Sequence, residues 1–324
     1  MEKYYFINGI STDAPFNIAS EEYLLKETNG YYIYVWQNAP AVIVGVNQNT
    51  LEEVELGYAE KQGIKVVRRL TGGGAVYHDL NNICYTVIAP YNKGEETFKR
   101  FSTPVIEYLK TLGVEATFSG RNDILVDGKK ISGTAETVYK NRIMHHGTLL
   151  FESDYNTIEK VLSPSKVKIE SKGIKSVKSR VTGVKEHLKS PLSISEFKSG
   201  LCEFLKKELE EYLFTGADLE RINNLATNKY STFAWNIGYS PKGKNKIEER
   251  FSFGTMTFNF DLIDGKIENP LFLGDFFLLK PLDNLYQKLN GVEWKKDSVS
   301  IAISDIDDYI KGAKKEEIIV KFFE

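Results

Sequence analysis

The chain has 324 residues, of which 42% are hydrophobic and 27% are charged, and its formal net charge is −2. These proportions are ordinary for a globular protein, and the near-neutral charge gives no overall basic field that would favour nucleic acid or a membrane surface as a partner. The length exceeds what a single hydrophobic core usually serves, so a large and a small domain are expected.

The cysteine content and the termini bear on location. Cys84 and Cys202 are the two cysteines, and they cannot form a disulfide framework, which suits a reducing compartment. No apolar run approaches the roughly 18 residues of a membrane-spanning helix, and the N-terminal MEKYYFINGI has no apolar region of the signal-peptide type. We therefore expect a cytoplasmic protein.

Capping residues and apolar patterns predict the N-terminal elements. Polar side chains that accept from backbone N–H groups precede helices, and aromatic or β-branched runs favour strands. The two strands expected here are separated by a short linker, so we predict a hairpin. In chain order the elements are a helix over residues 18–26 capped by Asn17, strands over residues 31–36 and 41–46 joined by residues 37–40, and a helix ending near Gly63 that begins with a capping box of Thr50 and Glu53.

The most informative stretch is RRLTGGGAVYHDLNN, residues 68–82, which lies between two runs of strand length at 64–67 and 83–88. Because no helix follows the glycines directly, the spacing matches neither a P-loop nor a dinucleotide-binding fingerprint. The glycines from Gly72 to Gly74 would let backbone N–H groups approach an anion, and the two arginines that open the stretch suit phosphate or carboxylate. The alternative is a tight turn with surface arginines.

A second informative stretch is DILVDGKKIS, residues 123–132, which predicts a β-hairpin with Asp127-Gly128 as its two-residue turn. Directly opposite residues of a hairpin share a sheet face. Asp123, Lys130 and Ser132 are therefore expected on one polar face, whereas Lys129 leaves from the other. The pairs predicted by this turn are Val126 with Lys129, Leu125 with Lys130, Ile124 with Ile131, and Asp123 with Ser132.

Residues 142–151 alternate as a strand, which places His146 on one face with Arg142 and Thr148, and His145 on the other. Neighbouring histidines on a strand cannot form a metal pair, and no zinc-ligand spacing occurs elsewhere. A single histidine on a strand is more often a satisfied core residue than a ligand.

The remaining chain predicts a basic loop, further helices and a small domain. Residues 166–189 are rich in Lys, Ser and Gly and lack an apolar period, which indicates a mobile loop. The polar residues 240–250 indicate a boundary between a domain of residues 1–243 and an α+β domain of residues 244–324. The other predicted elements are helices over 97–112 (closed by Gly113), over 193–212 (capped by Ser193 and Glu196) and over 218–229, strands over 251–262 and 266–272 around Asp264-Gly265, and helices over 282–289 and 303–311.

Five stretches together resemble one family. RRLTGGGAVYHDLNN is similar to the signature of lipoate-protein ligases, and four other motifs resemble that family in its order: residues 36–38 to 47–49, 122–133, 145–148 and 172–181. The resemblance covers nearly the whole chain. It implies an α/β protein with a mixed sheet, a biotin/lipoate ligase core that resembles class II synthetases, and a small α+β C-terminal accessory domain.

The resemblance also implies an activity. Such ligases use ATP and Mg²⁺ to convert lipoic acid to lipoyl-AMP, and they transfer the lipoyl group to a lysine of a lipoyl carrier domain, in a 2-oxoacid dehydrogenase E2 or a glycine cleavage H protein. Octanoate as the acid stays open. No nucleic-acid or membrane partner is implied, and the protein would contribute positioning and charge stabilisation with no nucleophile of its own.

Family roles transfer to matching residues. The resemblance makes Lys130 the catalytic lysine at the junction of carboxylate and α-phosphate, Asp123 a magnesium ligand and His146 a pocket histidine, and it makes the loop around Lys172 a cover for the adenylate. The substrate- and adenylate-binding residues that it implies are Trp36, Arg69, Gly72, Gly73, Gly74, Ala75, Tyr77, Asn82, Asp123, Lys130, Ser132, Gly133, Thr134, Ala135, His146 and Lys172.

One departure from the family and two alternatives bear on this interpretation. Thr134 and Glu136 replace the expected Ser or Asn and the expected Gln or aromatic residue, and Glu136 would add negative charge near the nucleotide. An ATP-independent octanoyl or lipoyl transferase of the same superfold would need a reactive cysteine, but Cys84 is expected in the core and Cys202 on a helix remote from the motifs. A non-catalytic binder of lipoate or carrier domains is the second alternative.

Overall fold

The computed structural model describes residues 3–120, 122–152, 154–162, 180–207, 209–238, 245–263 and 265–323. Its main feature is an 8-stranded sheet with the order β11-β1-β2-β6-β10-β9-β8-β7, in which β11, β1 and β2 are parallel and the pairs from β2 to β7 are antiparallel. The mixed sheet expected from the sequence is confirmed. Its strands are β1 (Tyr4–Asn8), β2 (Tyr31–Trp36), β6 (Asn82–Pro90), β7 (Thr117–Ser119), β8 (Asp123–Val126), β9 (Lys129–Tyr139), β10 (Arg142–Leu150) and β11 (Glu210–Glu211).

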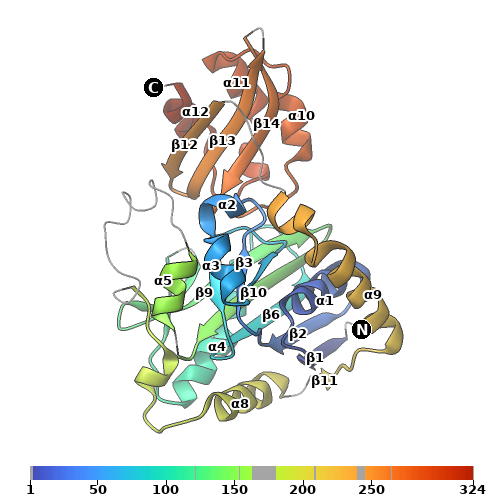
Figure 1. Ribbon diagram of the computed structural model, residues 1–324, viewed down its shortest axis with the longest axis vertical. Coiled ribbons are helices and arrows are strands. Elements are labelled where there is room, and N and C mark those ends of the chain that lie inside the picture. Colours follow the sequence, from blue (N-terminus) through green and yellow to red (C-terminus); the bar gives the residue numbers. More distant parts are fainter. Residues whose placement is uncertain are drawn as a thin grey trace.

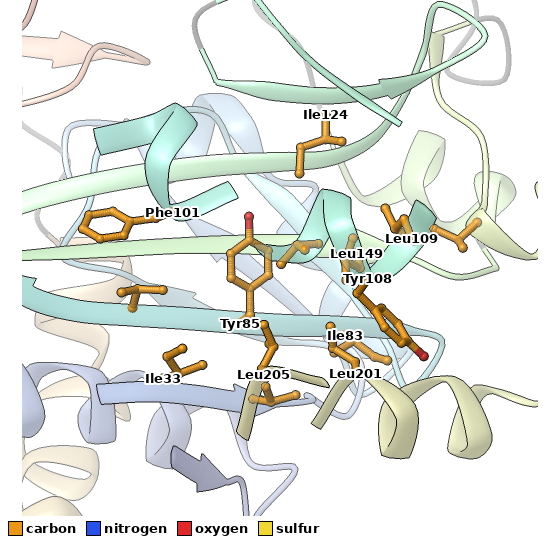
Figure 2. Close-up of a cluster of buried hydrophobic side chains, with 14 of the residues drawn as sticks. Ile33, Ile83, Tyr85, Phe101, Tyr108, Leu109, Ile124, Leu149, Leu201 and Leu205 are labelled. Atoms are coloured by element: carbon orange, nitrogen blue, oxygen red, sulfur yellow. The ribbon is translucent and has the colours of Figure 1, made fainter. Parts of the chain in front are cut away.

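Helices cover both faces of this sheet, so the central strands are apolar on both sides (Figure 1). One face packs on α4 (Thr97–Thr111) and α8 (Ile194–Lys206), and Figure 2 shows Tyr85 at the centre of that core with Phe101 and Leu205 around it. The other face carries alternate residues of the same strands and packs on α1 (Ala14–Glu27) and α9 (Gly216–Leu225). None of the helices in the described ranges is long and apolar enough to cross a bilayer.

A smaller sheet, with the order β4-β3-β5, lies beside the main one and carries the glycine-rich stretch. It consists of β3 (Ala41–Val44), β4 (Lys65–Arg68) and β5 (Val76–His78). The predicted hairpin of residues 31–46 is therefore wrong. The two strands exist, but residues 37–40 pass from one sheet to the other, where β3 pairs with β4 and β5.

Two predicted helix starts are also corrected. α1 begins earlier than expected because Asp13 caps it, accepting from Phe16 N at 3.4 Å, while Asn17 lies buried inside the helix. The helix expected after Thr50 is divided into α2 (Thr50–Glu53), capped by Asn49, and α3 (Leu56–Lys61).

The later helices form near their predicted positions, but the end of α8 and the start of α9 differ from the prediction. Ser193 and Glu196 form the expected capping box of α8, but this helix ends at Lys206, since the chain then enters the edge strand β11. α9 starts at Gly216 and is capped by Thr215 together with Asp218. α4 ends as predicted, with Gly113 at φ +75 after it. The other helical segments on this side are α5 (Tyr155–Val161), a 3₁₀ turn (Val184–His187) and π-helical turns (Ala226–Tyr230 and Ala234–Gly238).

The C-terminal part has a 3-stranded sheet and a hydrophobic cluster of its own. β13 (Gly254–Ile263) and β14 (Lys266–Gly274) pair as predicted, and β12 (Asn245–Phe251) adds a third strand. α10 (Asp283–Leu289) is also as predicted. The helix expected over residues 303–311 is wrong, because that segment holds only a 3₁₀ turn (Ile306–Asp308) between α11 (Lys296–Ala302) and α12 (Lys315–Phe323).

Candidate active site

A row of residues crosses five neighbouring strands of the main sheet on one face. In-register pairs place Trp36 of β2 opposite Cys84 of β6, and Cys84 opposite Thr148 of β10. Gly133 N of β9 donates to the Thr148 hydroxyl at 3.4 Å, and Gly133 pairs with Asp123 of β8. Because neighbouring strands lie about 4.8 Å apart, the row is roughly 19 Å long.

A cavity with a volume of about 470 Å³ lies over this row, and all five of its residues line it. At the β2 and β6 end the walls are mostly apolar, with Ile18, Trp36 and Ile43, whereas Asp123 and Lys130 make the β8 and β9 end charged. The arrangement suits a long ligand with an apolar tail and an ionic head. The sequence-predicted site residues that line it are Trp36, Arg69, Gly73, Gly74, Ala75, Asp123, Lys130, Gly133, Thr134, Ala135 and His146.

Other predicted residues lie elsewhere. Gly72 and Ser132 face neighbouring segments of the protein, and Tyr77 of β5 packs against the hydrophobic cluster that holds Val42 and Val44. Asn82 is buried, and its amide donates to Cys84 Sγ at 3.4 Å. None of these four lines the cavity. Lys172 and residues 166–179, which are most of the predicted basic loop, fall outside the described part of the chain.

The cavity also contains residues that the sequence did not single out. Asn122, His78 and Thr148 sit inside the quoted motifs, so the motifs were the available signal for them. Arg250, Ser252 and Asp275 come from the C-terminal part of the chain, where no local pattern marks them. They reach the cavity because β12 and the end of β14 approach the glycine-rich stretch.

The glycine-rich stretch is held in place from within. The Arg69 guanidinium donates to Gly72 O at 2.6 Å, to Gly74 O at 2.9 Å and to Ile43 O at 3.0 Å, and its Nε donates to Thr71 Oγ1 at 2.8 Å. Burial lowers the pKa of Arg69 to about 10, which still leaves it charged at neutral pH. Most of the hydrogen-bond donors of Arg69 therefore hold the backbone of the glycine-rich stretch in place.

The three glycines have different surroundings. A Cβ at Gly72 would lie 2.0 Å from Phe276 O, so this glycine permits close approach of the segment after β14. Gly73 has φ +89, and its N–H donates to the same carbonyl at 3.4 Å. Gly74 has open space around its Cα and lines the cavity. Gly72 and Gly73 thus contact Phe276, whereas Gly74 does not, and which of the three glycines holds an anion stays a prediction.

The hairpin of β8 and β9 differs from the predicted register by a bulge. Val126 pairs with Lys129 and Leu125 with Lys130 as predicted, but Ile124 then pairs with Ser132, and Asp123 with Gly133. The extra residue, Ile131, is buried beside Ser132. Ser132 therefore lies on the core side next to Tyr85, and its predicted place on the polar face is wrong.

Lys130 and Asp123 still share the polar face. Lys130 Nζ lies 2.7 Å from Asp123 Oδ1, and both side chains are about one-third exposed, at 33% and 37%. The lysine side chain lies over Gly133, where a Cβ would come within 2.6 Å of Nζ. Lys129 is exposed and does not line the cavity. The pair therefore combines a movable positive charge with a hard oxygen ligand at the charged end.

The two neighbouring histidines point to opposite faces, as predicted from the strand. His146 lines the cavity, where its Nδ1 is 2.8 Å from Glu21 Oε1 and its Nε2 is 2.8 Å from Thr71 Oγ1. His145 lies in the opposite core, where burial lowers its pKa although Glu136 lies 2.9 Å from Nδ1. Both ring nitrogens of His146 are engaged, which supports a positioning role and argues against a general base.

Glu136 does not reach the cavity, which corrects the expected negative charge near the nucleotide. Its carboxylate is buried, contacts His145, and accepts from Thr97 Oγ1 at 2.8 Å. Lys311 Nζ from the C-terminal part lies 3.5 Å from Glu136 Oε2. Glu136, which departs from the family pattern, therefore takes part in the contact between the N-terminal and C-terminal parts of the chain.

A metal site made by the protein alone is absent from the described ranges, which contain no cluster of three or more His, Cys, Asp or Glu side chains that could hold an ion. Asp123 is the predicted ligand that does line the cavity. Mg²⁺ commonly takes one or two carboxylates and completes its shell with substrate phosphates and water, so a single Asp fits such an ion only together with a nucleotide.

Two family models match the chain. The lipoyl protein ligase A/B catalytic domain matches residues 13–206, and the bacterial lipoate protein ligase C-terminus matches residues 240–322.

Two lipoate-protein ligases match over nearly the whole length of this chain and of their own. Lipoate-protein ligase 1 of Staphylococcus aureus is 41% identical over 311 residues, which cover 94% of each chain. Lipoate-protein ligase LplJ of Bacillus subtilis is 38% identical over 318 residues, covering 95% of this chain and 96% of that one.

Solved structures share the fold. LipL1 of P. falciparum in complex with lipoate has a TM-score of 0.79 at 25% identity and covers 98% of both chains. A lipoate-protein ligase A bound with ATP has a TM-score of 0.63 at 26% identity, covering 74% of this chain and 99% of that one. A bipartite lipoate protein ligase from Thermoplasma acidophilum, described with its E2 lipoyl domain, has a TM-score of 0.65 at 26% identity, covering 76% of this chain and 100% of that one.

Proposed function

Because the chain belongs to the lipoate-protein ligase family, we propose that it activates lipoic acid with ATP and transfers the lipoyl group to a lysine of a lipoyl carrier domain. The observation that carries this proposal is the row from Trp36 to Asp123, which joins an apolar end to an ionic end within one cavity. A lipoyl tail would lie over Trp36 and Cys84, with its carboxylate near Lys130.

The first half-reaction forms a mixed anhydride. A carboxylate oxygen of lipoate attacks the α-phosphorus of ATP, the bond from that phosphorus to the bridging oxygen breaks, and pyrophosphate leaves with the electron pair. Negative charge is redistributed around the α-phosphate during this step, so a fixed cation there stabilises the transition state. Lys130 occupies that position in the proposal, and Asp123 orients its ammonium group through the 2.7 Å contact.

The second half-reaction is acyl transfer. The neutral amine of the carrier lysine attacks the acyl carbon, an amide bond forms as the carbon–oxygen bond breaks, AMP leaves with the electron pair, and the amine nitrogen gives up one proton to solvent. The protein supplies alignment of the two reactants, which by itself can remove several kcal/mol from a barrier. His146, held between Glu21 and Thr71, would fix one wall against which the acyl chain is aligned.

Charge neutralisation on the phosphates comes from two further sources in this proposal. Asp123 would hold Mg²⁺ together with ATP, and the ion would neutralise phosphate charge when bound. Arg250 reaches the same cavity from β12 and lies 3.5 Å from Asp275, so it can offer a guanidinium to the nucleotide. Arg69 instead holds the loop from Gly72 to Gly74, which leaves Gly74 N–H as the anion contact there.

The rival interpretation is thioester transfer without ATP. Cys84 lines the cavity, but it is buried in β6 and burial raises its pKa, so it is a protonated thiol at neutral pH. Burial also raises the pKa of Cys202, which lies on α8 outside the cavity. Neither thiol has the low pKa that a nucleophilic cysteine needs, which favours the ligase.

Pyrophosphate release separates the alternatives. Wild-type protein with lipoate, ATP and Mg²⁺ should release pyrophosphate before any carrier is added. Carrier modification without pyrophosphate would support the transferase, and binding of lipoate with no turnover would support the binder. The same assay with octanoate would measure the preference of the protein between lipoate and octanoate.

Domain organisation and location complete the proposal. We take residues 1–243 as the catalytic domain and residues 244–324 as the accessory domain, in keeping with a separate hydrophobic cluster beyond residue 244. A cytoplasmic location and an E2 or glycine cleavage H protein as carrier stay predictions.

A further inference from the structure

His78 is a cavity residue to which the proposed mechanism gives no role. It ends β5, its side chain is 3% exposed, and it lines the apolar end of the cavity with Trp36 and Cys84. Its Nε2 is buried and has no hydrogen-bond partner among the described residues. A buried polar atom without a partner costs free energy, so such an atom in a binding cavity points to a ligand group.

A chain of hydrogen bonds determines which nitrogen of His78 carries the hydrogen. Asn17 Nδ2 donates to Gln37 O at 2.9 Å, and a carbonyl oxygen only accepts, so the orientation of the Asn17 amide is defined. The same Nδ2 donates to Asn38 Oδ1 at 2.9 Å, which defines the Asn38 amide in turn. Asn38 Nδ2 therefore donates to His78 Nδ1 at 3.1 Å. His78 Nδ1 is an acceptor, and the hydrogen of a neutral ring must be on Nε2.

The second neighbour of Nδ1 agrees with this assignment. Cys84 Sγ lies 3.5 Å from His78 Nδ1 and accepts from Asn82 Nδ2 at 3.4 Å, a contact that is compatible with an unprotonated Nδ1. Burial, with the nearby charge of Arg69, lowers the pKa of His78 to about 3, which keeps the ring neutral at working pH. His78 Nε2–H is therefore an unpaired donor, among the described residues, on a side chain that lines the apolar end of the cavity.

The position of this donor indicates which part of the substrate it would contact. The identity of that substrate rests on the proposed function. The carboxylate reacts near Lys130 on β9, whereas His78 lies with Trp36 of β2 and Cys84 of β6 at the other end of the row. The group that reaches it is the far end of the acyl chain. In lipoate that end is a dithiolane ring, whose sulfur atoms accept weak hydrogen bonds, and in octanoate it is a methyl group that cannot accept.

We propose that His78 Nε2–H donates to a dithiolane sulfur and makes this cavity prefer sulfur-bearing acyl tails over plain alkyl tails. A site that hydrogen-bonds its substrate rejects an analogue lacking the acceptor, because the buried donor is then left unpaired. Sulfur is a weak acceptor, so the preference due to His78 should be about tenfold, far below the discrimination that a hydroxyl-binding site reaches.

The test compares three acids in the pyrophosphate-release assay: lipoate, octanoate, and 5-cyclopentylpentanoate, which has the same ring size without sulfur. Wild-type kcat/KM should be about tenfold higher for lipoate than for the cyclopentyl acid. His78→Phe should reduce that ratio to near one, mainly by lowering the lipoate value. His78→Gln, which can place an amide N–H near the Nε2 position, should retain part of the ratio, whereas His78→Asn, whose amide ends near Nδ1, should not.

The outcomes separate the inference from the function on which it rests. A wild-type ratio near one would overturn the inference without any variant, so misfolding of a variant cannot protect it. A tenfold wild-type ratio that persists in His78→Phe and His78→Asn would also overturn it while leaving the ligase intact. Absence of pyrophosphate release with every acid would remove the proposed function and the inference together.

Discussion

Lys130 Nζ lies 2.7 Å from Asp123 Oδ1 across a hairpin whose register is interrupted by a bulge between them. A regular register would have paired Asp123 with Ser132, but the bulge brings Gly133 opposite Asp123. Because Gly133 has no side chain, the lysine can lie over it and reach the carboxylate. The bulge therefore creates the space in which the charged end of the cavity is assembled.

Loss of the Lys130 ammonium should mainly affect adenylation. Lys130→Ala should fold normally and form lipoyl-AMP about 10²- to 10³-fold more slowly, by analogy with removal of a single oxyanion donor. Preformed lipoyl-AMP should restore transfer to the carrier at least in part, because the phosphate step is then complete. Lys129→Ala is the matched control, since Lys129 is exposed and outside the cavity. Equal losses in the two variants would contradict the assigned role.

Gly133 should be required for the position of Lys130. In Gly133→Ala the new Cβ would lie 2.6 Å from Nζ and 2.8 Å from Cε of Lys130, so the lysine must move away from Asp123. We expect roughly a tenfold loss in pyrophosphate release with little change in thermal stability, since a 1 Å displacement of a catalytic group can cost up to about a hundredfold. Gly57→Ala in α3 is the control, because its Cβ would meet open space. Full activity in Gly133→Ala would show that the lysine position is not critical.

The cysteines should be dispensable. A protein with both Cys84→Ser and Cys202→Ser should retain lipoate ligation, because the proposed mechanism has no covalent acyl-enzyme and both thiols have raised pKa values. The measurement is carrier lipoylation by the folded double variant. A folded variant without any ligation would favour thioester transfer.

Stability should fall in mild acid because of His78. Its folded pKa of about 3 lies below its ordinary value of 6.5, so the unfolded state binds the proton first and stability is lost as pH falls below about 6.5. Between pH 7 and pH 5 this one residue should remove about 2 kcal/mol from the free energy of unfolding. His145, whose pKa is also lowered by burial, acts in the same direction.

Urea unfolding at the two pH values tests this prediction. The loss between pH 7 and pH 5 should be about 2 kcal/mol smaller in His78→Phe than in wild type, after each is compared with its own value at pH 7. An identical loss in the two proteins would mean that His78 is protonated in the folded state.

The predictable parts of this site are those set by local periodicity. The opposite orientation of His145 and His146 follows from strand alternation alone, and the structure confirms it. Lys130 and Asp123 share a face because Leu125 pairs with Lys130 as predicted and Asp123 lies two residues from Leu125 on β8, so the bulge beyond that pair does not change their faces. Ser132 was misplaced because no sequence pattern here signals the bulge.

Tertiary partners were not predictable in the same way. The strands of residues 31–46 were recognised by composition, but composition does not say which strand each will pair with, and the two joined different sheets. The predicted cap of α1, Asn17, lies inside the helix, because the helix begins one turn earlier, after Asp13. Arg250 and Asp275 belong to the cavity only because the C-terminal part of the chain approaches the glycine-rich stretch, where Gly73 N–H donates to Phe276 O.

Intact-mass analysis of a lipoyl carrier domain tests the central claim most directly. The carrier is incubated with the protein, lipoate and Mg²⁺, with and without ATP, and its mass is measured. We predict an increase equal to one lipoyl group, present only with ATP and lost when the carrier lysine is replaced by Arg. Modification that is independent of ATP, or no modification of any lipoyl carrier while ATP and lipoate are present, would contradict the assignment.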